Sequence, residues 1–325
     1  MVSVSIVVPT YNRAHLLGRT VRSLVLQTYA DIEIVVVDDA STDSTPEVLE
    51  RLSRQDKRVR PIRLKRNSGV AVACNTGIET SQGKYVCTIA DDDIAMPELV
   101  EASVKALERG ADIGFAYSDF VLVRHEDFYI VRTPQSEGIT YEEALAGTCP
   151  VGPGWFFRRH ALVEVGGFDP SLRVAEDWDI FRRIIRAGWR IAHTGIVGAI
   201  KFESERMLSR KYALYADTFK AIMRRCEEDF DRFPLAKSKI LSVIGMYSMR
   251  AGRWKDGLKF LQRSLKEKPA APIVWLQFLF ALGGPSVYSI GDGIYRKLHS
   301  AYRTKTVDKN FKQELIQWIK RVESD

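Results

Sequence analysis

Four short apolar runs, each followed by polar residues, restrict the fold of this chain more than any other feature. Val4 to Val8 and Ile32 to Val37 are rich in β-branched residues and predict buried strands. Val59 to Leu64 and Lys84 to Ile89 predict two more, and helical patterns separate the runs at about residues 14–27, 45–52 and 70–80. This alternation predicts an α/β fold with a doubly wound, mostly parallel sheet and helices on both faces. Its ligand crevice is expected beyond the carboxyl ends of the strands.

Three consecutive acids, Asp91, Asp92 and Asp93, come directly after the fourth predicted strand. Carboxylates this close together repel each other unless a cation lies among them. Mg²⁺ and Mn²⁺ prefer oxygen ligands and also bind phosphate oxygens, so the acids suggest a metal that holds a diphosphate. The alternative is an acidic turn before the helix that Pro97 and Glu98 begin.

Several further motifs stand in a defined order along the first 200 residues. They are Val4–Arg13, Ile34–Asp43, Asn67–Gly69, Asn75–Gly77, the acidic triplet, Gly166–Asp169 and Glu176–Asp179. With this ordered set the chain resembles the inverting family 2 glycosyltransferases, which have the GT-A (nucleotide-diphospho-sugar transferase) fold. The resemblance covers residues 2 to about 200.

The resemblance implies a donor site for a nucleoside diphosphate sugar, with a UDP- or dTDP-sugar favoured. Tyr11 would stack on the base, and Asp39 would accept a hydrogen bond from its N–H. Four other residues would shape the loops around the nucleoside: Pro9, Thr10, Asn67 and Gly69. The alternatives are ordinary loop roles, with Tyr11 a half-buried aromatic and Asp39 and Gly69 turn residues.

The same resemblance implies roles for the acidic triplet and for one lysine. Asp92 would bind Mg²⁺ or Mn²⁺, Asp91 would contact the ribose or a metal-bound water, and Asp93 would support the metal or contact a second one. Many relatives begin this motif with an acid where the chain has Ala90. Lys201 would be the phosphate-binding cation, since it stands where the family often carries an arginine or a histidine.

An acceptor side is implied for the segments around Trp155 and Trp178. Aromatic rings beside glycines suit a stacked sugar. Inversion by direct displacement needs one carboxylate to take the proton of the acceptor hydroxyl. Asp177 is the predicted base and Glu176 the residue that orients the acceptor, whereas Asp179 is expected on the helix surface or at its cap.

Charge divides the chain at about residue 205. Residues 1–205 are predicted to form the GT-A catalytic domain, with a nucleotide-sugar half (1–100) and an acceptor half (101–205). Residues 206–325 hold 24 Lys and Arg against 12 Asp and Glu, a formal charge of +12, and predict a basic helical region. Trp275, Phe278 and Phe280 near one end and Trp318 near the other suggest contact with an anionic membrane surface. The alternatives are a helical cap on the catalytic domain or a homo-oligomer interface.

The sequence therefore predicts a metal-dependent inverting glycosyltransferase that acts on a glycan or lipid-linked acceptor. An inactive sugar-nucleotide-binding or scaffold protein is the alternative from another class. A nucleotidyltransferase on a related sheet is the other alternative, but residues 9–13 do not form its Gly-rich phosphate loop. No nucleic-acid motif is present. Four cysteines without pairing or metal spacing favour a cytoplasmic location, with a peripheral place on the cytoplasmic face of the membrane.

Overall fold

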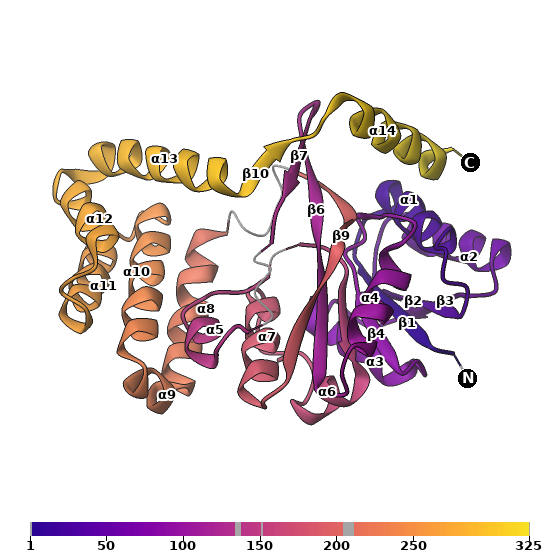
Figure 1. The fold of residues 1–325 in the computed structure, drawn as a ribbon, viewed down its shortest axis with the longest axis horizontal. Helices are drawn as coiled ribbons and strands as arrows, with labels where there is room; N and C mark the ends of the chain where they lie inside the picture. The colour runs from indigo at the N-terminus through magenta and orange to yellow at the C-terminus, as the bar shows by residue number, and fades with distance from the viewer. Residues whose placement is uncertain (1, 134–137, 151, 204–210, 325) are drawn as a thin grey trace.

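The computed structural model describes residues 2–133, 138–150, 152–203 and 211–324, with backbone only for 295–304. A ten-stranded mixed sheet forms its centre, in the order β10-β7-β6-β8-β4-β1-β2-β3, with β9 alongside β6 and β5 alongside β9. Figure 1 shows helices on both sides of this sheet and a separate group of helices at one end. The mixed α/β fold with a mostly parallel central sheet is the fold that the sequence predicts.

The N-terminal half follows the predicted alternation of strands and helices closely. Its elements are β1 (Val4–Thr10), α1 (Ala14–Val25), β2 (Ile32–Asp38), α2 (Thr45–Gln55), β3 (Val59–Arg63), α3 (Val70–Thr80) and β4 (Tyr85–Thr88). Strand β1 lies between β2 and β4 and is parallel to both. The residues that follow β1, β2 and β4 therefore meet at one edge of the sheet.

The two faces of these strands are buried by different helices, because successive side chains of a strand point to opposite sides. Ile6 and Ile34 belong to a cluster with Leu17 of α1 and Leu49 of α2. Val7 and Val35 belong to a second cluster with α3. Nearly continuous apolar strands are what a sheet covered on both faces requires.

The second half of the sheet is mixed in strand direction. Its elements are β5 (Ile94–Ala95), α4 (Leu99–Glu108), β6 (Ile113–Arg124), β7 (Asp127–Val131), α5 (Tyr141–Leu145), β8 (Trp155–Arg158), α6 (Arg159–Glu164), α7 (Glu176–Arg186) and β9 (Arg190–Phe202). Strand β8 is antiparallel to β4 and β6, whereas β9 runs parallel to β6. This arrangement brings the start of α7 and the end of β9 to the edge where β1, β2 and β4 end.

The C-terminal region consists mainly of helices. They are α8 (Tyr212–Arg225), α9 (Glu227–Arg232), α10 (Pro234–Arg250), α11 (Trp254–Glu267), α12 (Pro272–Leu282), α13 (Gly284–Arg303) and α14 (Lys309–Glu323), with β10 (Thr304–Thr306) before α14. Gly252, with a φ of 76°, lies in the short turn between α10 and α11. None of the helices in the described part of the chain combines the length and apolar composition needed to cross a bilayer.

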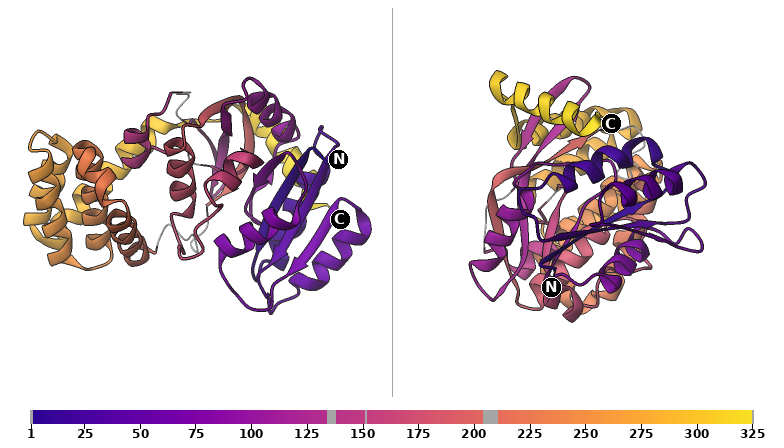
Figure 2. Two further views of the ribbon diagram at one scale, coloured as in Figure 1. Left: turned by 90° about the horizontal axis from the view of Figure 1, so that it is seen from below. Right: turned by 90° about the vertical axis from the view of Figure 1, so that its right-hand side faces the viewer.

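The last helix returns to the catalytic half of the molecule. Strand β10 pairs with β7 at the sheet edge, and α14 packs against α1; the right-hand view in Figure 2 shows α14 beside the N-terminal helices. Trp318 is 9% exposed, and its indole N–H donates to the carbonyl of Ala95. The expectation that Trp318 meets a membrane is therefore wrong, because its ring fills a hydrophobic cluster with Ile94 and Val121.

Candidate active site

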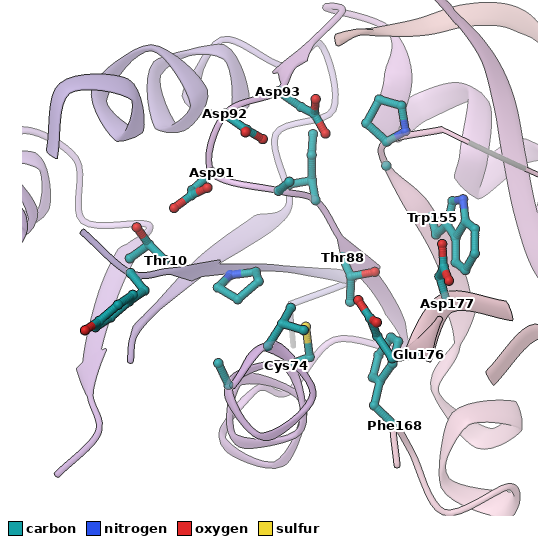
Figure 3. Close-up of a pocket in the computed structure, with 18 of the residues that line it drawn as sticks. Thr10, Cys74, Thr88, Asp91, Asp92, Asp93, Trp155, Phe168, Glu176 and Asp177 are labelled. Atoms are coloured by element: carbon teal, nitrogen blue, oxygen red, sulfur yellow. The ribbon is translucent and has the colours of Figure 1, made fainter. Parts of the chain in front are cut away.

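A cavity of about 510 Å³ opens at the edge where β1, β2 and β4 end. Most of the predicted site residues contribute to its lining: Pro9, Thr10, Tyr11, Asp39, Asp91, Asp92, Asp93, Trp155, Glu176, Asp177 and Lys201. Figure 3 shows the acidic triplet and the Glu176–Asp177 pair as two separate groups around this cavity. The structure thus brings together residues that lie up to 192 positions apart in the sequence, Pro9 and Lys201.

The loops after β1 and β2 form one end of the cavity and are tied to each other. The side-chain oxygen of Asn12 accepts hydrogen bonds from the backbone N–H groups of Thr42 and Asp43, at 2.7 and 3.3 Å. Asn12 and Ala40 both have positive φ, of 54° and 61°. Such strained backbone persists where surrounding contacts hold it. The two loops therefore form a fixed wall for a ligand.

Tyr11 and Asp39 present different surfaces on this wall. Tyr11 is 43% exposed, so its ring is free to stack on a planar group. Asp39 is buried, and its two oxygens accept hydrogen bonds from the N–H groups of Ser68 and Gly69, at 2.7 and 2.8 Å. Each carboxylate oxygen has a second lone pair, so Asp39 keeps acceptor capacity toward a ligand.

Asn67 and Gly69 do not line the cavity themselves. Gly69 has a φ of 95°, and a Cβ atom there would lie 2.6 Å from the guanidinium of Arg173. Glycine is thus favoured by the backbone conformation, whereas the Arg173 side chain could move away from a Cβ atom. The segment 67–69 therefore supports the Asp39 carboxylate from behind and does not form part of the cavity lining.

The backbone of the acidic triplet is held by side chains of α1. The hydroxyl of Thr20 in α1 donates a shared hydrogen bond to the carbonyl oxygens of Asp91 and Asp93, at 2.9 and 2.7 Å. Arg19 donates to the carbonyl of Asp92 at 3.1 Å. The carboxylates therefore stay available for a ligand while α1 fixes the loop.

Two cations face the triplet. Arg13 contacts the Asp92 carboxylate at 3.3 Å, and the Lys201 amine lies 3.6 Å from Oδ1 of Asp93. Burial raises the pKa of Asp91 to about 6 and the pKa of Asp93 to about 7. The neighbouring Asp93 carboxylate raises the pKa of Lys201. Two positive charges, on Arg13 and Lys201, thus face three carboxyl groups, so these side chains neutralise only part of the negative charge that the ionised triplet would carry.

The triplet fits a hard divalent cation through one or two carboxylates. Oδ1 of Asp93 is buried and accepts no hydrogen bond from the described residues. Within those residues, no three His, Cys, Asp or Glu side chains converge on one point as a complete metal cage. Mg²⁺ usually binds one or two carboxylates together with substrate phosphates, so this donor set agrees with such a site.

The second acidic group begins α7. Ala175 precedes this helix with a left-handed backbone, φ 59° and ψ 21°, and turns the chain so that Glu176 and Asp177 enter the first turn at the cavity. Figure 3 shows both carboxyl groups near Thr88 and Trp155. Both residues line the cavity; Asp177 is exposed, whereas Glu176 is half-buried.

The electrostatics of this pair differ from those of the triplet. Desolvation by the surrounding protein raises the pKa of both Glu176 and Asp177, and the adjacent negative charge raises that of Glu176 further. Asp177 accepts one hydrogen bond, from the N–H of Trp178 at 2.7 Å. In the described part of the chain, no ion pair joins either carboxylate to a cation within 4.0 Å. A carboxylate that is open, desolvated and unpaired is suited to accept a proton.

Two of the neighbouring predictions differ from the structure. The Trp178 ring lies outside the cavity, against Phe219, and its N–H donates to the carbonyl of Ala144 at 2.8 Å. Asp179 is neither on the helix surface nor a cap, because it is 3% exposed and pairs with Arg182 and Arg183. Both residues point to the buried side of α7, where an amphipathic helix meets its core.

Trp155 lies at the cavity but is mostly enclosed. Its exposed fraction is 6%, and its ring meets Phe115 edge to face, with 5.2 Å between ring centroids. Phe156 and Phe157 are fully buried, as expected for core strand residues. Only the edge of the Trp155 ring is thus available to a ligand.

Several lining residues were missed by the sequence reasoning. Tyr215 of α8 lines the cavity from the C-terminal region and stacks on Tyr247, with ring centroids 5.1 Å apart and planes inclined by 16°. Phe168 also lines the cavity, and the Asn75 side chain fixes it with two hydrogen bonds to its backbone. Asn75 belongs to a motif quoted for the family resemblance, which could have pointed to Phe168; no local pattern marks Tyr215.

Comparison with known proteins identifies the family. The family model described as "Glycosyl transferase family 2" matches residues 5–166. The uncharacterized glycosyltransferase YwdF of Bacillus subtilis is 31% identical over 185 residues, which cover 55% of this chain and 67% of YwdF. The chain belongs to glycosyltransferase family 2, a family of transferase enzymes.

Other relatives match over a smaller part of their length. An uncharacterized glycosyltransferase of Rickettsia felis is 30% identical over 176 residues, 54% of this chain and 29% of that longer protein. The putative teichuronic acid biosynthesis glycosyltransferase TuaG of Bacillus subtilis is 32% identical over 149 residues, 45% of this chain and 58% of TuaG. The chain thus spans less than two thirds of these two relatives.

Solved structures support the GT-A fold. TarS 1-349 of S. aureus superimposes with a TM-score of 0.62 at 18% identity, covering 91% of both chains. The mannosyltransferase PcManGT of Pyrobaculum calidifontis superimposes with a TM-score of 0.59 at 20% identity, covering 91% of this chain and 86% of its own. At such identities the likeness concerns the fold.

Proposed function

We propose that this protein transfers a sugar from a nucleoside diphosphate donor to a hydroxyl of a glycan or lipid-linked acceptor, with inversion of the anomeric centre. One observation carries this proposal: Tyr11 and Asp39, the acidic triplet and the Glu176–Asp177 pair all line the same cavity. These three parts correspond to the needs of the reaction: a nucleoside site, a diphosphate site and a proton acceptor.

The nucleoside end of the donor is proposed to lie on Tyr11, with Asp39 accepting a hydrogen bond from a base N–H. We favour a uridine or thymidine diphosphate sugar, because the N3–H of uracil or thymine can donate to a carboxylate at the wall. TarS 1-349 has been solved with UDP-GlcNAc, and PcManGT with GDP-Man and Mn²⁺. Proteins with this fold thus bind different nucleotide sugars, and the choice here rests on Asp39.

The diphosphate end is proposed to lie at the triplet. Asp92 and Asp93 would hold Mg²⁺ or Mn²⁺, with Asp91 directed to the ribose or to a water of the ion. When bound, the ion supplies positive charge that stabilises the diphosphate as a leaving group. Lys201 lies beside Asp93 and adds a second positive charge on the same side.

The acceptor hydroxyl is proposed to lose its proton to Asp177. Its carboxylate opens into the cavity, and no cation of the described residues forms an ion pair with it within 4.0 Å, so its charge remains available to a proton. Glu176 beside it would orient the acceptor. Tyr215 and the edge of Trp155 would contact the acceptor sugar, because flat aromatic surfaces suit the apolar faces of sugar rings.

The division of the chain follows from these assignments. Residues 1–205 are proposed as the catalytic domain, with the donor on 1–100 and the acceptor on 101–205, and Tyr215 is a contribution from beyond that boundary. The relatives TuaG and WcaA are named for putative teichuronic acid and colanic acid biosynthesis, which supports a role in polysaccharide assembly. All four cysteines are free thiols, in agreement with the proposed cytoplasmic location.

A screen of nucleotide sugars by thermal shift, with and without Mn²⁺, tests the donor assignment. A uridine or thymidine diphosphate sugar is expected to raise the melting temperature only with the metal present. A proton NMR time course with that donor then reports the product anomer. Retention of configuration would reject the single displacement, and stabilisation by no nucleotide sugar would reject the transferase proposal.

A further inference from the structure

Exposed apolar side chains are concentrated on two consecutive helices of the C-terminal region. Eight of the eleven large hydrophobic side chains exposed in the described residues lie between positions 273 and 294. Helix α12 contributes Ile273, Trp275, Leu276, Leu279 and Leu282. The first half of α13 contributes Val287, Ile290 and Ile294. These eight residues are called the apolar face below.

The inner sides of both helices are already packed. Val274 and Ala281 of α12 and Tyr288 of α13 are buried, in one cluster with Leu261 and Met249. The fold of the helices therefore does not need their outer side chains. Exposed apolar side chains gathered on two consecutive, well-packed helices mark an interaction surface.

The charge around the apolar face is mostly positive. Residues 269–291 contain no charged side chain. On the adjacent helix α11, Lys255, Lys259 and Lys266 are exposed, and no ion pair joins them to a carboxylate of the described residues. The two acids of α11 form ion pairs, Asp256 with Lys220 at 3.7 Å and Glu267 with Lys237 at 3.0 Å, and Asp292 of α13 pairs with Arg250 at 2.6 Å.

We propose that the apolar face docks on the surface of an anionic lipid bilayer. The lysines of α11 would meet lipid phosphates while the apolar side chains enter the boundary of the acyl chains. Trp275 contributes an apolar ring to this boundary, and its N–H donates to the carbonyl of Pro269 at 2.7 Å. With 11 residues, α12 is shorter than the ~20 residues of a spanning helix and would lie along the surface.

A second copy of the chain is a less suitable occupant. A two-fold contact places the same patch on both partners, so the lysines that border one apolar face would approach those that border the other. Like charges across an interface are unfavourable. Figure 1 shows α11 and α12 at the end of the molecule opposite α14, so docking there leaves the α1 and α14 side in water. The proposal does not depend on the transfer reaction.

Flotation of the full chain with lipid vesicles tests the proposal. Vesicles of phosphatidylcholine with phosphatidylglycerol are expected to bind the protein, whereas pure phosphatidylcholine vesicles bind it weakly. Raising NaCl from about 50 mM to about 500 mM should release much of the protein, because salt screens the lysines. The double variant Leu276→Gln, Leu279→Gln should lose binding at least about tenfold, since it removes two inserted apolar side chains.

Two matched charge variants separate the site from net charge. Lys255→Gln with Lys259→Gln removes two charges from α11, which packs against α12, and should weaken binding severalfold. Lys309→Gln with Lys320→Gln removes two exposed charges from α14 and should leave binding unchanged. Thermal unfolding checks that each variant is folded, and the exposed positions predict that it is.

Three results would overturn the proposal. The full chain could ignore the anionic vesicles at low salt, or the leucine variant could bind them as the natural chain does. Sedimentation equilibrium could instead show a dimer that the leucine variant converts to a monomer, without vesicle binding; the apolar face would then be an interface between copies of this chain.

Discussion

The two acidic groups of the cavity differ in how the protein treats their charge. The triplet lies opposite Arg13 and Lys201, and α1 holds its backbone through Thr20. The Glu176–Asp177 pair has a raised pKa at both carboxyls and no such cation within ion-pair distance among the described residues. The triplet, whose carboxylates lie beside cations, suits the binding of a metal ion and a diphosphate. A desolvated carboxylate without a partner suits proton transfer.

The largest effect is expected from Asp177→Asn. The amide keeps the shape of the side chain but cannot take the acceptor proton, so turnover should fall by about 10²- to 10⁴-fold. Initial rates with a donor and acceptor pair measure it. Glu176→Gln is the matched control, with a smaller loss. If Glu176→Gln is the inactive variant and Asp177→Asn is active, the two roles are reversed.

A smaller effect is expected from substitution of Tyr215, which tests whether this residue contacts the acceptor. Tyr215→Ala removes a ring from the cavity and should raise the acceptor KM roughly 2- to 10-fold, with little change in donor KM. Tyr215→Phe keeps the ring and should stay close to the natural enzyme. Tyr212→Ala, on the same helix but outside the cavity lining, controls for packing. An unchanged acceptor KM in Tyr215→Ala would remove this residue from the site.

The smallest effect is expected in the stability of the metal-free protein as a function of pH. Carboxyls with raised pKa keep their protons in the folded state to higher pH than in the unfolded chain. The unfolded state binds fewer protons in this window, so the free energy of unfolding falls as pH rises. The window runs from about 4, where an unfolded carboxyl ionises, to about 7, the value of Asp93.

The measurement is the melting temperature between these limits, without and with Mn²⁺. The fall should amount to a few degrees and should shrink when the ion is present, since a cation favours the ionised carboxylates. Carboxyls with a lowered pKa, such as Asp119, change the free energy of unfolding only at pH values below this window. A melting temperature that rises from pH 4 to pH 7 without metal would contradict the raised values.

Local sequence patterns predicted the N-terminal half well because its elements are fixed by local signals. The predicted helix 70–80 is α3 with the same bounds, and β1, β2 and β4 differ from their predictions by one or two residues. Continuous apolar strands, and polar residues where they end, follow directly from a parallel sheet covered on both faces. The motif order then led to the residues that meet at the cavity.

The C-terminal region was less predictable because its structure depends on distant contacts. The basic and aromatic composition predicted membrane contact for the segments of both α12 and α14. In the structure, however, Trp318 is buried against the sheet and Trp275 is exposed. The pairing of β10 with β7 joins positions more than 170 residues apart. Tyr215 reaches the cavity only through the packing of α8. No pattern within a single segment encodes such contacts.

One measurement tests the division of roles most directly: calorimetric titration of Asp92→Asn and Asp177→Asn, side by side, with Mn²⁺ and the nucleoside diphosphate of the preferred donor. We predict that Asp177→Asn binds the diphosphate as the natural protein does, whereas Asp92→Asn loses most of the metal-dependent affinity because a ligand charge is removed. Equal binding by both variants, or loss in Asp177→Asn alone, would contradict the account.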